Sequence, residues 1–104
     1  MLDAATAVAG SAPAFFYALA QSLAAAGVEA GLTPDAAERL TRGALRSAGS
    51  GVATDASLED LIARIASPGG TTRAGLDALN AADLDAAGQA AVKAAVARAG
   101  ELSV

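Results

Sequence analysis

The residues best suited to chemistry form one glycine-rich run, residues 67–72, with the sequence Ser-Pro-Gly-Gly-Thr-Thr. A turn of this kind that leads into a helix presents unpaired backbone N–H groups at the positive end of the helix dipole. The two threonine hydroxyls can add hydrogen bonds, so the run suits a carboxylate or another small anion. The same pattern is also typical of an ordinary corner between two helices, in which a threonine caps the second helix. The local pattern leaves both interpretations open.

The amino-acid composition excludes several other kinds of functional site. The chain has no cysteine and no histidine, which excludes disulfides, zinc fingers and histidine-based catalysis, and we predict no metal site. The net charge is −4, and the seven basic residues are scattered rather than gathered in a stripe. Nucleic acid is therefore not a predicted partner, because binding to phosphates needs a basic surface.

The elements that would position the run are predicted to be helices throughout. Alanine accounts for 32 of the 104 residues and is the best helix former, whereas no segment shows the period-2 pattern of a strand. We expect a short helix over residues 4–9, a break at residues 10–12, and a long helix over residues 13–30. Pro13 suits the first turn of that helix, and Gly31 suits its end.

Three further helices follow from caps and apolar spacing. Thr33 and Pro34 open a helix that the glycines at residues 49–51 should end. Ser57 begins a capping box, and four apolar residues then follow at helical spacing: Leu58, Leu61, Ile62 and Ile65. Thr71 or Thr72 can cap a helix that runs through Leu79. The last helix is expected over residues 83–99, with Gly100 as its stop.

Residues 4–28 form the longest uncharged segment. Its length would span a bilayer, but it contains Gly, Ser, Pro and Gln, and no basic cluster flanks it. We therefore expect a buried helix and no membrane partner. With so many alanines and only three aromatic residues, a lone chain would have a thin core. The apolar surface of such a helix must be shielded from water by another subunit, so we predict an obligate homodimer.

Four segments, taken in order, resemble a known family. They are residues 3–8 (Asp-Ala-Ala-Thr-Ala-Val), 10–16 (Gly-Ser-Ala-Pro-Ala-Phe-Phe), 26–32 (Ala-Gly-Val-Glu-Ala-Gly-Leu) and 67–76 (Ser-Pro-Gly-Gly-Thr-Thr-Arg-Ala-Gly-Leu). Together they look like the C-terminal dimerisation domain of the pyrroline-5-carboxylate reductases, over about the whole chain. The combination of the two glycine-containing motifs, about 55 residues apart, is specific, whereas either motif alone would be weak.

The resemblance implies an all-α helical bundle that forms an intertwined (interlocked) homodimer, which can assemble further. It implies a cytoplasmic enzyme that reduces 1-pyrroline-5-carboxylate, a small imino acid, to L-proline with NADPH or NADH. An N-terminal Rossmann domain holds the nucleotide in this family. No Gly-x-Gly-x-x-Gly occurs in this sequence. We therefore expect residues 1–104 to be the dimerisation domain without its Rossmann domain, inactive alone and with no cofactor bound.

The resemblance also assigns roles to residues. In the family the glycine-rich loop holds the substrate carboxylate, which points to the backbone amides of Gly70 and Thr71. Thr72 matches the threonine near the ring nitrogen and is the predicted catalytic residue. Ser67 and Gly69 belong to the same substrate loop.

The first glycine-containing motif is expected near the reacting ends of cofactor and substrate, through Ser11 and Pro13. Ala12 stands where most of the family has glycine. A second hypothesis stays open, in which the chain is a helical homodimerisation module with no ligand-binding or catalytic role. A third, remoter one is a helical protein that binds membranes or lipid.

Overall fold

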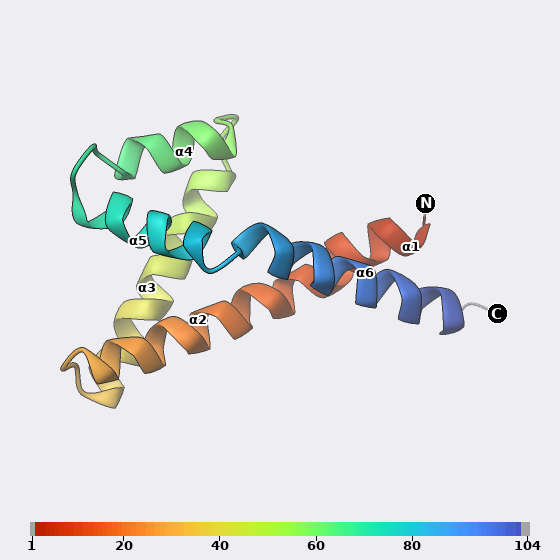
Figure 1. Cartoon of the computed structure of the whole chain (residues 1–104), viewed down its shortest axis with the longest axis horizontal. Coiled ribbons are helices and arrows are strands. Elements are labelled where there is room, and N and C mark those ends of the chain that lie inside the picture. Colours follow the sequence, from red (N-terminus) through yellow and green to blue (C-terminus); the bar gives the residue numbers. More distant parts are fainter. Residues whose placement is uncertain (1, 103–104) are drawn as a thin grey trace. The chain divides into compact units, whose positions relative to one another are not determined.

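The computed structural model describes residues 2–102 and is helical throughout, with no strand among these residues (Figure 1). The prediction of an all-α fold is thus confirmed. The elements are α1 (Leu2–Ala5), the π-helix η1 (Thr6–Ser11), α2 (Ala12–Glu29), α3 (Pro34–Val52), α4 (Leu58–Ile65), α5 (Thr71–Ala81) and α6 (Leu84–Leu102). The described residues form two compact units, residues 14–65 and residues 2–13 with 66–102, which are described separately.

In the unit of residues 14–65, α2 ends as the sequence predicts. Gly31 has a φ of 117°, a conformation that glycine adopts without strain. The Gly31 N–H bonds to the Val28 carbonyl, and the Leu32 N–H reaches back to the Gly27 carbonyl, each at 3.0 Å. These two bonds make a Schellman motif, which satisfies the last carbonyls of the helix. Leu32 lies against Gly27, so closely that a methyl group there would come within 3.2 Å of it.

The predicted start of α3 is confirmed, and its predicted end is wrong. The Thr33 hydroxyl accepts a hydrogen bond from the Ala36 N–H at 3.2 Å, and Pro34 occupies the first turn. The helix does not stop at residues 49–51 but continues to Val52. A glycine inside a helix costs only about 0.5–1 kcal/mol, so glycines alone do not end one. Gly51 also lets α4 approach, because a methyl group there would lie 3.4 Å from Leu61.

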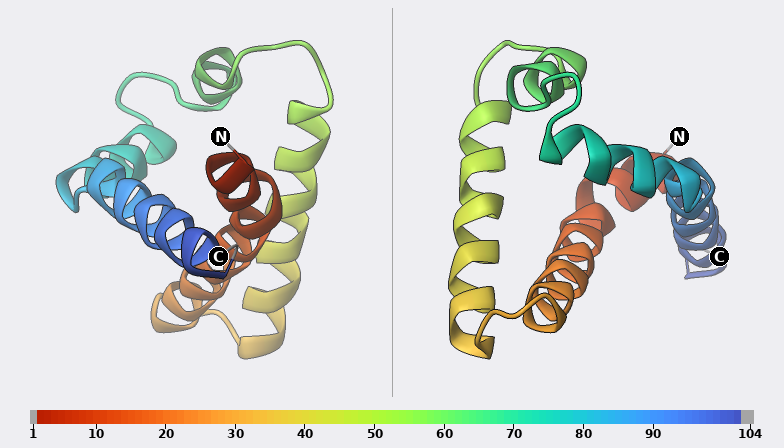
Figure 2. Two further views of the ribbon diagram at one scale, coloured as in Figure 1. Left: turned by 90° about the vertical axis from the view of Figure 1, so that its right-hand side faces the viewer. Right: turned by 60° about the vertical axis from the view of Figure 1, so that its left-hand side comes forward.

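The α2 and α3 helices diverge from their connecting turn rather than packing along their length (Figure 2). Near the turn they meet at Ala37, which is buried and lies 3.6 Å from the position of a methyl group on Gly27. The cap of α4 is as predicted, since the Ser57 hydroxyl accepts from the Asp60 N–H at 3.1 Å. The unit is therefore a hairpin closed at one end and open along its apolar interior.

In the other unit, α1 and η1 lie beside α6, and α5 adjoins α6 (Figure 1). Ala7 of η1 is buried in this packing. Gly100 was expected to stop the last helix, but α6 continues to Leu102. Gly100 does not take the left-handed conformation of a helix stop. Its missing side chain instead leaves room for the Asp3 carboxylate, which would lie 3.4 Å from a methyl group there.

The predicted break at residues 10–12 is also wrong. The chain stays helical from Leu2 to Glu29, and the irregularity takes the form of the wider π-helix over Thr6–Ser11. Gly10 has no positive φ, so it does not act as a turn residue. At the α5–α6 corner the left-handed position is instead taken by Asp83, with φ 66°. Aspartate tolerates this conformation better than most residues.

Few side chains are buried within a single chain. Among residues 3–102, whose burial is described, only Ala7, Ala37 and Ala66 are buried apolar residues. Most large apolar side chains are exposed, including Phe16 at 60% and Leu23 at 51%. The stretch Asp3–Glu29 is long and apolar enough to cross a membrane, and 6% of its most apolar window is buried. The expected burial of this segment is thus absent within one chain.

Candidate functional site

Residues 67–70 form a tight turn before α5. The Gly70 N–H donates to the Ser67 carbonyl at 3.1 Å, which closes a four-residue turn. Pro68 occupies the second position and Gly69 the third, where φ is 75°. This is the pattern of a type II turn, in which proline presets the second residue and the third must have a positive φ. The order Pro-Gly therefore fixes the shape of the loop.

Gly70 is the N-cap of α5, and the prediction that Thr71 or Thr72 caps the helix is wrong. The Gly70 backbone is extended, and no side chain makes a capping hydrogen bond there. Both threonines already lie within the first turn. A methyl group on Gly70 would come within 2.8 Å of the Ser67 Oγ and 3.3 Å of the Ser67 carbonyl oxygen. A side chain at this position would therefore crowd Ser67, and glycine leaves the cap without a side chain.

Three backbone N–H groups at the start of α5 have no partner in the described part of the chain. The first helical bond runs from the Ala74 N–H to the Gly70 carbonyl at 3.1 Å, which leaves the amides of Thr71, Thr72 and Arg73 unpaired. The threonine side chains are exposed, and neither hydroxyl has a hydrogen bond among residues 2–102. The start of α5 therefore offers several donors at the positive end of a helix, a combination that suits an anion.

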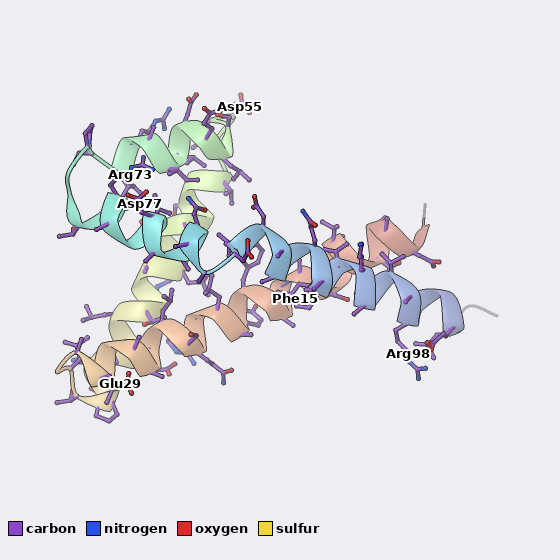
Figure 3. The ribbon with its side chains drawn as sticks, viewed as in Figure 1. Phe15, Glu29, Asp55, Arg73, Asp77 and Arg98 are labelled. Carbon is purple, nitrogen blue, oxygen red and sulfur yellow. The ribbon has the colours of Figure 1, made fainter. Side chains whose placement is uncertain are left out.

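Arg73 is the feature of this loop that the sequence reasoning missed. It is the only charged residue in positions 65–76, and it is half-buried. Figure 3 places it one helical turn before Asp77, yet no ion pair joins the two among the described residues. A cation at the start of a helix opposes the dipole, so the position is unfavourable for stability. The unfavourable placement of Arg73 could have been noticed in the sequence. Its guanidinium adds positive potential beside the unpaired amides.

The second predicted group, Ser11 and Pro13, lies at the junction of η1 and α2. Ser11 is half-buried, and its hydroxyl has no hydrogen bond within the described part of the chain. Pro13 is exposed in the first turn of α2. A methyl group on Gly10 would meet nothing within 4 Å, so the backbone there is open to approach. The junction offers the Ser11 hydroxyl within residues 4–28, a stretch that carries no charged side chain.

The two groups lie on elements that do not pack extensively on each other. The η1 segment packs on α6, and α5 adjoins α6, but η1 and α5 share no extensive contact among the described residues. The loop precedes α5, whereas Ser11 ends η1 (Figure 1). The residues from Ser67 to Thr72 thus share one loop, while Ser11 and Pro13 form a separate place in the same unit.

Comparison with known proteins identifies the family. Residues 1–102 match the sequence profile described as "Pyrroline-5-carboxylate reductase dimerisation". The chain belongs to the pyrroline-5-carboxylate reductase dimerisation family. The resemblance predicted from the two motifs is therefore confirmed, along almost the whole chain.

Individual members of the pyrroline-5-carboxylate reductases show how much is shared. The Pseudomonas aeruginosa enzyme is 38% identical over 103 residues, which cover 98% of this chain and 38% of that protein. The Coxiella burnetii structure has a TM-score of 0.87 at 35% identity, over 96% of this chain and 37% of its own. A Plasmodium falciparum structure with NADP bound has a TM-score of 0.85 at 33% identity, over 93% of this chain and 37% of its own. The chain thus spans less than two fifths of these relatives.

Proposed function

We propose that this chain is the dimerisation and substrate-loop domain of a full-length pyrroline-5-carboxylate reductase. Such an enzyme reduces 1-pyrroline-5-carboxylate to L-proline in the cytoplasm. The observation that carries the proposal is the set of unpaired amides at the start of α5, on the sequence Ser-Pro-Gly-Gly-Thr-Thr. A reduced nicotinamide, NADPH or NADH, supplies the hydride when bound, and the NADP in the Plasmodium falciparum relative supports this choice. A Rossmann domain outside residues 1–104 would hold it.

The geometry refines the predicted contacts to the substrate carboxylate. Gly70 and Thr71 were the expected donors, but the Gly70 N–H is already used in the turn. We therefore assign the carboxylate to the amides of Thr71 and Thr72, with Arg73 adding positive charge beside them. Gly69 and Gly70 shape the loop, and the Ser67 hydroxyl is a further donor near the same point.

The Thr72 hydroxyl is the group we assign to the ring nitrogen. Reduction adds a hydride to the imine carbon and a proton to the nitrogen, which yields the secondary amine of proline. A threonine hydroxyl is a poor acid, so Thr72 orients the nitrogen and can relay a proton to it. This assignment is supported by its exposed hydroxyl, which no other described residue engages.

The partner we propose is a second copy of the chain, interlocked with the first. The open α2–α3 hairpin contains an apolar groove of about 410 Å³, lined among others by Phe16, Leu19, Leu23 and Leu40. A helix of another subunit can fill such a groove, and obligate dimers typically bury more than about 2,000 Å². The exposed α2 would then be covered by protein rather than by membrane. Because η1 and α5 do not pack extensively on each other within one chain, we place these two groups of the complete site on different subunits.

Titration of the isolated chain with L-proline tests the carboxylate site. We expect amide chemical shifts to move at residues 69–73 and to remain constant in α3. Shifts spread evenly over the chain, or none at millimolar proline, would favour the second hypothesis of an association module without a ligand. The exposed apolar face of α2 is the observation that favours that second hypothesis.

A further inference from the structure

The π-helix η1 is the least regular part of the long N-terminal helix. It covers Thr6–Ser11 and lies directly before Ala12 and Pro13. A π-helix is rare, and a single wide turn inside an α-helix is found mostly at functional sites. Ala7 in the same turn is buried, so the turn belongs to the packed part of the molecule and is not a frayed end.

Pro13 gives the physical reason for the wide turn. In an uninterrupted α-helix its ring would clash with the carbonyl of Ala9, four residues earlier, and it has no N–H to donate. Widening the preceding turn moves that carbonyl away. Gly10 is not needed for this, because its backbone has no positive φ and a methyl group on it would meet nothing within 4 Å.

We infer that Pro13 is a positioning residue that acts through Ser11, an inference that rests on the function proposed above. A wide turn holds one residue more than an α-turn, and one residue corresponds to about 100° of rotation around a helix. The turn therefore sets the direction of the Ser11 hydroxyl, which is half-buried and has no partner among the described residues. Without proline the segment would relax toward an α-helix and re-aim that hydroxyl.

The test uses the full-length reductase with Pro13→Ala, and Pro34→Ala as the matched control. Pro34 occupies the first turn of α3, away from the turn that holds Ser11. Since misplacing a reacting group by about 1 Å can cost as much as 10²-fold, we expect kcat to fall at least about tenfold in Pro13→Ala. We expect KM to stay within about twofold. We expect Tm not to fall, because residue 13 lies inside the continuous helical segment from Leu2 to Glu29, where proline is unfavourable. Pro34→Ala should keep its kcat.

The double variant Ser11→Ala/Pro13→Ala should be no slower than Ser11→Ala alone, since both changes remove the same contact. A normal kcat in Pro13→Ala or in Ser11→Ala overturns the inference, and the proposed function survives if Thr72→Ala is still impaired. The isolated Pro13→Ala chain gives an independent result. A structure in which residues 6–11 remain a π-helix overturns the inference even if no reductase activity is found.

Discussion

The α2–α3 hairpin and the loop of residues 67–72 are built in opposite ways. The hairpin presents apolar side chains, and the backbone groups at its turn are satisfied by the Schellman motif that ends α2 and the Thr33 cap that begins α3. The loop has few apolar side chains and presents backbone donors instead, because its turn uses one N–H and leaves the next three unpaired. The first arrangement suits a protein surface, and the second suits a small anion.

Because of this difference, we expect the hairpin to determine association between chains and the loop to determine ligand binding. The hairpin buries little within one chain, so its apolar faces should determine whether the chain assembles at all. The loop depends on local geometry, with Gly69 and Gly70 each held in a defined conformation. Changes in the hairpin should therefore act on association, and changes in the loop should act on chemistry or local stability.

The largest expected effect is that of Leu23→Asp in the hairpin. Leu23 lines the apolar groove that a second copy would cover in the proposed dimer, and an unpaired charge buried there would cost about 3–5 kcal/mol or more. We expect sedimentation to show loss of the dimer and circular dichroism to show loss of helix. Ser22→Asp is the control on the same helix, since Ser22 does not line that groove. A folded monomer of the wild-type chain at micromolar concentration would contradict the proposed dimer.

The second effect concerns chemistry in the loop. In the full-length enzyme, Thr72→Ala should lower kcat/KM by roughly 10²-fold if the hydroxyl relays a proton, with little change in Tm. Thr54→Ala should show the reverse pattern. Its hydroxyl bonds to the Gly51 carbonyl and accepts from the Ala56 N–H, so the variant should lose about 1 kcal/mol of stability and keep its activity. A Thr72→Ala enzyme with normal kcat/KM would reduce Thr72 to a structural residue.

A smaller effect is expected when glycine is replaced by alanine, either in the turn of residues 67–70 or inside a helix. Gly69→Ala should destabilise the chain by about 1–2 kcal/mol, because residue 69 has a φ of 75°. Gly88→Ala in α6 should instead stabilise the isolated chain by about 0.5–1 kcal/mol, since a methyl group there meets nothing within 4 Å. Urea denaturation measures both. Destabilisation by Gly88→Ala would indicate that a second copy packs against that point.

The smallest effect is expected at the cap of α3. Thr33→Ala removes the hydrogen bond to the Ala36 N–H and should cost about 1 kcal/mol, while Thr33→Ser should cost little. Thermal unfolding of the two variants at one protein concentration gives the comparison. Equal Tm values for wild type and Thr33→Ala would mean that water replaces the hydroxyl at no cost.

The sequence predicted the elements better than their ends. Caps with a specific side chain were predicted correctly at Thr33 and Ser57, because one hydroxyl and one N–H decide each of them. Glycine predicted the ends of helices poorly. A helix ended at Gly31, but α3 continued through the glycines at residues 49–51 and α6 continued through Gly100. A glycine stops a helix only where the following residues complete a motif such as the Leu32–Gly27 bond.

The site was predicted in part. The two motifs identified the loop and the junction at Ser11, but the sequence could not show that the turn uses the Gly70 N–H. That detail depends on the conformation of Gly69. The π-helix was missed because the pattern Gly-Ser-Ala-Pro predicts a break as readily as a wide turn, and either one relieves the clash between the Pro13 ring and the preceding turn.

The packing of α1 on α6 has a consequence for re-engineering the chain. Asp3 approaches Gly100, so the two ends of the described segment lie next to each other. A short glycine-rich linker could therefore join them, and new ends could be opened in the exposed turn at Thr54 and Asp55. Such a circularly permuted chain should keep the native helices. In it, α1 and α6 would become internal segments joined through the linker, and α3 and α4 would lie at the new ends.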